Sequence, residues 1–227
     1  EKNIELRADA AAAAQVAQWL SAQPPLAHGR VRILLHASAG DPNRTWPQAH
    51  WQALAARLIN DGHQVIAISH RSKVANRGVQ ALEVPGLLHS DEGWDALGRI
   101  ALMRESHLLV SPDSGPIQLA AATDIGIVGI YSVIAGANRL PYRHGAAMWR
   151  AVTVEPACAE APCYEKLNDA QVVARYTRDV MGGQNDVPRL FAEFCLAPER
   201  YRCMQHDNSV ERVYAACVKC LAEPLPA

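Results

Sequence analysis

Residues 108–131, LLVSPDSGPIQLAAATDIGIVGIY, restrict the possible fold more than any other part of this chain. An apolar run, a polar turn with Gly and Pro, a run of small residues and a second apolar run predict strand, loop, helix and strand. Two parallel strands joined by a crossover helix form a βαβ unit. In an open α/β sheet, ligands bind beyond the carboxyl ends of such strands.

The polar turn of this unit contains Asp113, Ser114 and Gly115. The first N–H groups of a helix lack intrahelical partners and carry the positive end of the helix dipole, so an anion is the natural ligand there. Gly115 permits close approach of a backbone, Ser114 offers a hydroxyl, and Asp113 can cap the helix or bind a ligand hydroxyl. The turn is therefore a candidate anion site.

The preceding part of the chain repeats this alternation. Apolar runs over residues 31–36 and 64–69 predict two further strands, and a helix after Pro47 that ends at Asp61-Gly62 joins them. Another helix, starting at Ser90-Asp91, leads to the strand at residues 107–110. We expect a doubly wound parallel sheet.

The ends of the chain depart from this alternation. Residues 8–23 predict an Ala-rich helix, and residues 135–142 predict a loop after the last strand. Beyond Thr153 no further βαβ unit is expected, and Asn208 with Glu211 predicts a capping box for a final helix packed on the sheet. We divide the chain into a lead-in (1–30), a Rossmann-like nucleotide-sugar-binding domain (31–153), and a Cys-rich tail with the final helix (154–227).

The composition argues against two classes of protein. The chain has 227 residues, 49% of them hydrophobic, which is ample for a buried core. Its formal net charge of −1, with both signs spread along the chain, argues against a nucleic-acid partner. No apolar run approaches the length of a transmembrane segment, so none is expected.

Several ordered motifs resemble the C-terminal half of the family-nine glycosyltransferases, the heptosyltransferases of lipopolysaccharide assembly and their relatives. The similarity is strong over residues 33–131 and looser at residues 162–164 and 202–204. The motifs are His36-Ala37-Ser38-Ala39, Arg44-Thr45-Trp46-Pro47, the helix ending in Asp61-Gly62, and Asp113-Ser114-Gly115-Pro116-Ile117-Gln118-Leu119-Ala120-Ala121-Ala122.

This resemblance implies a GT-B enzyme, in which two Rossmann-like domains face each other and the C-terminal one binds a nucleotide-diphosphate sugar, ADP-heptose in the best-known members. It implies that Arg44 neutralises the diphosphate. The donor site would consist of two loops that clamp the diphosphate, with Ser38, Arg44, Thr45, Asp113, Ser114, Gly115 and Gln118 as its residues. Trp46 and Trp51 are expected in the core or the cleft wall, and His36 beside the loop.

The sequence departs from the family pattern in three ways. Gln118 stands where the family usually has His, and a Gln donates hydrogen bonds but carries no positive charge. The loop over residues 70–73 lacks the carboxylate expected to bind the ribose, and the sequence leaves the choice of nucleobase open. The acceptor domain and the catalytic base of the family have no counterpart, so the chain is interpreted as a donor-binding fragment with its base elsewhere.

The resemblance implies an inverting transfer to a lipopolysaccharide-type or other glycan or lipid-linked acceptor, which would be bound through the missing N-terminal domain. No divalent metal or other cofactor is required by the motifs, because no Asp-x-Asp loop is present and a basic side chain can replace the cation. The expected location is the cytoplasm, with peripheral association at the inner membrane left open. The alternative is a non-catalytic nucleotide-sugar-binding or assembly module with a Cys-rich interaction tail; an unrelated flavodoxin-like domain is a weaker one.

Six cysteines follow residue 157. Their spacing is compatible with a local disulfide staple, a metal site or buried thiols. Cys158, Cys163, Cys195 and Cys203 are the candidate metal ligands, because the resemblance implies cysteines near these places and some relatives have an iron-holding finger. A buried thiol is the favoured interpretation for Cys217.

Overall fold

The computed structural model describes residues 9–68, 82–146 and 148–223. In this part of the chain six parallel strands form one sheet, in the order β3-β2-β1-β4-β5-β6. The strands are β1 (Arg32–Leu35), β2 (Gln64–Ala67), β3 (Leu88–His89), β4 (Leu108–Pro112), β5 (Gly126–Ile130) and β6 (Ala151–Val154). The expected α/β fold with a doubly wound parallel sheet is confirmed.

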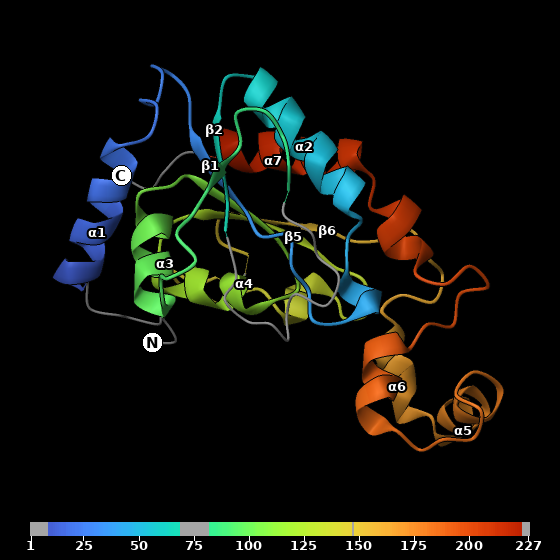
Figure 1. The fold of residues 1–227 in the computed structure, drawn as a ribbon. Coiled ribbons are helices and arrows are strands. Elements are labelled where there is room, and N and C mark those ends of the chain that lie inside the picture. Colours follow the sequence, from blue (N-terminus) through green and yellow to red (C-terminus); the bar gives the residue numbers. More distant parts are fainter. Residues whose placement is uncertain (1–8, 69–81, 147, 224–227) are drawn as a thin grey trace.

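Helices cover both faces of the sheet (Figure 1). Alternate strand residues face opposite sides, so Ile33 and Leu35 join the core under α2 and α7, whereas Leu34 joins the core beneath α1, α3 and α4. All three side chains are fully buried. The helices are α1 (Ala10–Ser21), α2 (Gln48–Asn60), α3 (Ala96–Arg104), α4 (Gly115–Leu119), α5 (Ala170–Asp179), α6 (Val187–Glu193) and α7 (Val210–Ala222).

The strand order reverses between β1 and β4. These strands pair directly, with Leu35 opposite Val110, although the chain from β1 runs first to β2. The carboxyl ends of β1 and β4 therefore form the topological switch point, where loops diverge and leave a crevice. The loops that follow the two strands are the two loops that the sequence singled out.

Local signals placed some helix ends correctly and others not. Gly62 ends α2 with a φ of +86°, as the Asp61-Gly62 pair predicted. The predicted helix start at Ser90-Asp91 is wrong, because α3 begins at Ala96 and the Asp95 carboxylate accepts from the N–H groups of its first turn. An Asp earlier in the same loop is equally suited to cap a helix, so local sequence does not choose between them.

The predicted capping box at the last helix is also wrong. Ser209 caps α7, whereas Asn208 is fully buried and its Nδ2 donates to the Tyr131 carbonyl at 2.8 Å. The Asn208 carbonyl accepts from Trp46 Nε1 at 2.6 Å. Asn208 thus joins α7 to the end of β5 and to the loop before α2, a tertiary role that outweighs local capping.

The interpretation of Tyr131 as the end of the last strand is wrong, because β6 follows and pairs with β5. Strand β6 has only four residues, and the segment between β5 and β6 contains no α-helix in its described part, only the 3-10 turn η3 (Gly136–Asn138). The periodicity of a βαβ unit is therefore missing there. The sequence-based division at residue 153 falls inside β6 and remains a prediction.

The tail forms a small helical unit at one end of the sheet (Figure 1). Helices α5 and α6 enclose a third apolar cluster, in a segment where no further βαβ unit was expected. The cluster is small because it draws one or two residues from each element, a pattern that periodicity does not reveal. Its buried members are Cys163, Tyr176, Met181, Leu190 and Phe194. Within the described residues, no helix has the length and apolar character needed to cross a membrane.

Candidate functional site

Two cavities, of about 610 and 410 Å³, flank the turn between β4 and α4. Both cavities lie at the carboxyl ends of β1 and β4, because the loops that follow these two strands supply residues to each cavity. The residues common to the two cavities are Arg44, Asp113, Ser114 and Gly115. Four of the seven donor-site residues expected from sequence are thus brought together by the pairing of β1 with β4.

Arg44 lies on the 3-10 turn η1 (Pro42–Arg44), which the loop after β1 forms before α2. Its Nη2 pairs with the Asp41 carboxylate, and its Nη1 donates to the Asp113 carbonyl at 3.1 Å. Burial by itself lowers the pKa of Arg44, but the hydrogen bond to Asp41 and the charges of Asp41 and Asp113 raise it overall. Arg44 is therefore a fixed cation with its side chain 23% exposed.

Asp113 is almost buried, with 7% of its surface exposed. Its Oδ2 lies 3.6 Å from Arg44 Nη1 and 3.2 Å from Arg139 Nε. The capping role considered for Asp113 is wrong, because Ser114 is the residue that precedes α4 and makes no side-chain cap hydrogen bond. Since α4 has only five residues, its dipole is small, and the arginines supply most of the positive charge at this turn.

Ser114 belongs to a buried hydrogen-bonded group that joins the two loops. His36, at the end of β1, places its Nδ1 at 3.1 Å from the Ser114 hydroxyl and at 3.3 Å from the Ser111 hydroxyl. The two hydroxyls are 2.9 Å apart. His36 is 1% exposed and lines the 410 Å³ cavity together with Ser38. The sequence drew attention to His36 without assigning it a role, and the structure gives it contacts that orient Ser114.

Gln118 and Thr45 have different surroundings. Gln118 lines the 610 Å³ cavity, where its Nε2 donates to the Arg139 carbonyl at 2.7 Å. Thr45 faces away from that cavity, and its hydroxyl donates to the Asp41 carbonyl at 2.8 Å. The structure therefore does not bring Thr45 together with Asp113, because the η1 turn directs its side chain to the other side of the loop.

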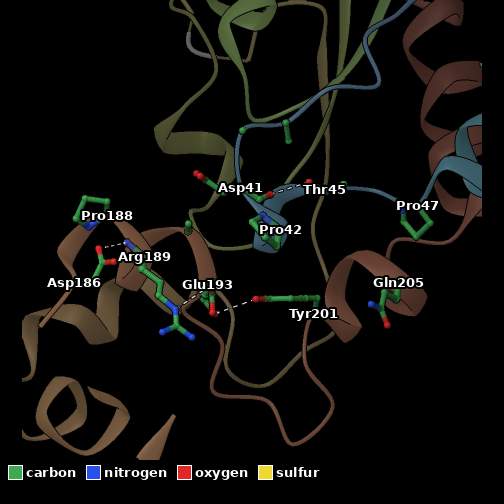
Figure 2. Close-up of a pocket in the computed structure, with 13 residues that line it drawn as sticks. Asp41, Pro42, Thr45, Pro47, Asp186, Pro188, Arg189, Glu193, Tyr201 and Gln205 are labelled. Atoms are coloured by element: carbon green, nitrogen blue, oxygen red, sulfur yellow. Dashed lines mark hydrogen bonds and ion pairs between the residues drawn. The ribbon is translucent and has the colours of Figure 1, made fainter. Parts of the chain in front are cut away.

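Thr45 instead lines a third cavity, of about 820 Å³, which is the largest of the three described here. Figure 2 shows this cavity between the loop after β1, helix α6 and Tyr201. Its ionised groups are already paired with one another or with neighbours. Arg189 pairs with Glu193 across one turn of α6, and Asp41 pairs with Arg44. Asp186 accepts from the Arg189 N–H. With its charges compensated internally, this cavity is a weaker candidate for a phosphate group.

All six cysteines are free thiols. Burial above all, together with the charges of Cys195 and Cys158, raises the pKa of Cys163 to about 11 and that of Cys203 to about 12. The four candidate ligands are thus close enough to influence one another. Among the described residues, however, no group of three or more His, Cys, Asp or Glu side chains is arranged to hold a metal ion.

Sequence reasoning missed Arg139. This residue follows β5 by several positions and reaches Asp113 across 26 positions of sequence, so no local motif connects them. The one available signal was its place in a loop after a strand of the same sheet, because such loops converge at one edge. The loop over residues 70–73, considered for ribose contacts, lies outside the described residues.

Comparison with known proteins places the chain in a family. The profile of glycosyltransferase family 9 (heptosyltransferase) matches residues 2–168. Lipopolysaccharide heptosyltransferase 2 of Salmonella typhimurium is 29% identical over 117 residues, which cover 49% of this chain and 34% of that protein.

Two solved structures share the fold. The family 9 glycosyl transferase of Veillonella parvula superposes with a TM-score of 0.67 at 15% identity, over 97% of this chain and 54% of that one. The ADP-heptose lipopolysaccharide heptosyltransferase II of Escherichia coli gives a TM-score of 0.58 at 16% identity, over 96% of this chain and 53% of that one. This chain spans about a third of its curated relative and about half of each solved structure. Because the family profile matches most of its length, the chain belongs to glycosyltransferase family 9, the heptosyltransferase family.

Proposed function

We propose that this chain binds the nucleotide-diphosphate sugar donor of a heptosyltransferase-like glycosyltransferase. The observation that carries the proposal is the position of Arg44, a partly exposed cation, beside the Asp113-Ser114-Gly115 turn at the switch point of the sheet. A cation with a glycine-containing turn suits a diphosphate, because a guanidinium donates paired hydrogen bonds to phosphate oxygens and the turn admits them closely.

ADP-heptose is the proposed donor. The relatives' names support this choice, since the Escherichia coli enzyme that shares the fold is an ADP-heptose lipopolysaccharide heptosyltransferase. The acceptor would be a glycan of lipopolysaccharide type or a related lipid-linked glycan. We place the reaction in the cytoplasm or at the inner membrane surface, where such a donor and acceptor would meet.

In the proposed inverting reaction, an acceptor hydroxyl attacks the anomeric carbon of the donor sugar. A bond from the acceptor oxygen to this carbon forms while the bond from the carbon to the diphosphate oxygen breaks, and the nucleoside diphosphate leaves with the electron pair. The hydroxyl proton passes to a base outside this chain. Arg44 would stabilise the negative charge that develops on the departing diphosphate, an effect that increases in the transition state. Asp113 would accept a hydrogen bond from a hydroxyl of the sugar.

Titration calorimetry of the purified chain with ADP, GDP, UDP and ADP-heptose tests the proposal. We expect ADP and ADP-heptose to bind, and folded protein that binds none of the four would refute donor binding. Transfer is tested separately, with the acceptor-binding half present. If the donor binds and no transfer follows there, the chain is a binding module rather than part of an enzyme.

A steric variant locates the binding site. A Cβ at Gly115 would meet no heavy atom within 4 Å, so Gly115→Val, with its folding checked by circular dichroism, fills space that both cavities share. We expect it to abolish nucleotide binding. Ala174→Val, at an exposed position of α5, is the matched control and should bind normally.

A further inference from the structure

Four ionised side chains form a network of ion pairs beside the turn between β4 and α4, and Arg139 is the second cation of this network. Asp41 and Asp113 both pair with Arg44, and Asp113 also pairs with Arg139. Without Arg139, the two carboxylates of this network would share one guanidinium. The other polar side chains of the 610 Å³ cavity, which are Ser114, Gln118, Asn138 and Tyr142, carry no formal charge. Arg139 therefore offsets negative charge that would oppose binding of a diphosphate in this cavity.

The backbone around Arg139 is held in place from several sides. The turn η3 begins at Gly136, whose N–H donates to Glu155 Oε1 at 2.7 Å, and the Leu140 N–H donates to the Gly136 carbonyl at 2.8 Å. The Leu140 side chain is 7% exposed. Gln118 Nε2 donates to the Arg139 carbonyl at 2.7 Å, which ties the loop to α4. Arg139 therefore occupies a defined position opposite the Asp113 turn.

The guanidinium itself is only partly engaged. Its Nε donates to Asp113 Oδ2 at 3.2 Å, the side chain is 43% exposed, and the residue lines the 610 Å³ cavity. Among the described residues, nothing accepts a hydrogen bond from its two Nη groups. One edge of the guanidinium is thus fixed by Asp113, and the other edge has donors available to a ligand in the cavity.

We propose that Arg139 is the second cation of the 610 Å³ cavity, beside Arg44, and makes the donor site selective for a diphosphate over a monophosphate. This inference rests on the proposed donor binding. Arg44 and Arg139 both contact Oδ2 of Asp113 and both line the 610 Å³ cavity, so one ligand with two adjacent phosphoryl groups can contact both guanidinium groups. A monophosphate has one such group and can satisfy only one arginine fully. Arg139 is a specificity-determining residue from a loop that the donor motifs do not include.

Paired titrations test this inference. The wild-type chain, Arg139→Gln and Arg139→Lys are titrated by calorimetry with ADP and AMP, GDP and GMP, and UDP and UMP. We expect Arg139→Gln to weaken binding of the diphosphate by about 10- to 100-fold, as for other hydrogen bonds to charged groups, and that of the monophosphate by less than about threefold. Arg139→Lys should retain most of the preference, because it keeps the charge. Diphosphate binding by Arg139→Gln should also depend less on salt concentration.

The controls separate this inference from a structural role and from the proposed function. Arg175→Gln removes a charge from an exposed position of α5 and should leave all affinities unchanged. Equal losses for diphosphate and monophosphate in Arg139→Gln would show that Arg139 only supports the fold, and unchanged diphosphate affinity would overturn the inference directly. In both cases wild-type binding stands. If the wild-type chain binds no nucleoside diphosphate, the proposed function fails and this inference fails with it.

Discussion

Replacing Arg44 by Gln removes the one cation that the sequence motif and the structure both place at the proposed donor site. The side chain is held by the Asp41 carboxylate and the Asp113 carbonyl, so it is already ordered before a ligand binds. Glutamine keeps a hydrogen-bond donor and much of the volume. The substitution therefore tests the charge of Arg44 more than the packing of its side chain.

The magnitude follows from two effects. A hydrogen bond to a charged group contributes about 1.5–3 kcal/mol, and the bond from Arg44 to a phosphate oxygen is of this type. The variant also leaves Asp41 without its ion-pair partner and Asp113 paired with Arg139 alone, so a diphosphate meets less compensated negative charge. We expect a loss of about 2–3 kcal/mol in binding free energy, which weakens ADP binding by about 30- to 150-fold.

Titration calorimetry of wild type and Arg44→Gln with ADP measures this loss, and thermal unfolding followed by circular dichroism checks that the variant is folded. Arg175→Gln serves again as the control for loss of one positive charge. A folded Arg44→Gln variant with less than about threefold weaker ADP binding would refute the assignment of Arg44 to the diphosphate.

Three further predictions concern stability and reactivity. Gly136→Ala should lower the free energy of unfolding by about 1–3 kcal/mol in urea titrations. The reason is that its Cβ would lie 2.6 Å from the ring of the tyrosine that follows β5. Burial and nearby arginines lower the pKa of His107, so the unfolded chain binds a proton more readily than the folded chain. The melting temperature should therefore fall as pH decreases below about 6.5, and it should fall less in His107→Gln. Burial raises the pKa of the four buried thiols, so a thiol reagent near neutral pH should label the half-buried Cys158 and Cys195 first, as read by mass spectrometry.

Each of these predictions has a matched control. Gly40→Ala introduces a Cβ where no atom lies within 4 Å, so its stability should equal that of the wild type. Stability that does not change between about pH 7.5 and about pH 5.5 would contradict the histidine argument. Labelling of all six thiols at one rate would contradict the burial of the other four, and full labelling in denaturant shows that all six are reactive when exposed.

The donor loops illustrate how far local sequence carries a site. Arg44 and the turn at Asp113 were identified from motifs, since the chemistry of a phosphate site needs a cation and a turn that admits close approach. The directions of the side chains in these loops could not be identified from motifs. Thr45 directly follows Arg44 in the same loop, yet its hydroxyl contacts the Asp41 carbonyl and its side chain lines the other cavity. A single 3-10 turn decides this, and its geometry depends on the surrounding tertiary contacts.

By itself, the sequence determined the fold class, the family and the pair of loops, because apolar periodicity and short motifs are local properties of the chain. Only the tertiary structure decided how these two loops meet and which other segments reach them. The pairing of β1 with β4 joins two loops that are distant in sequence, the short strand β6 extends the sheet, and the loop after β5 brings Arg139 to Asp113. These outcomes depend on strand order and long-range packing, to which no local pattern corresponds. The second arginine beside Asp113 is thus a property of the fold rather than of a motif.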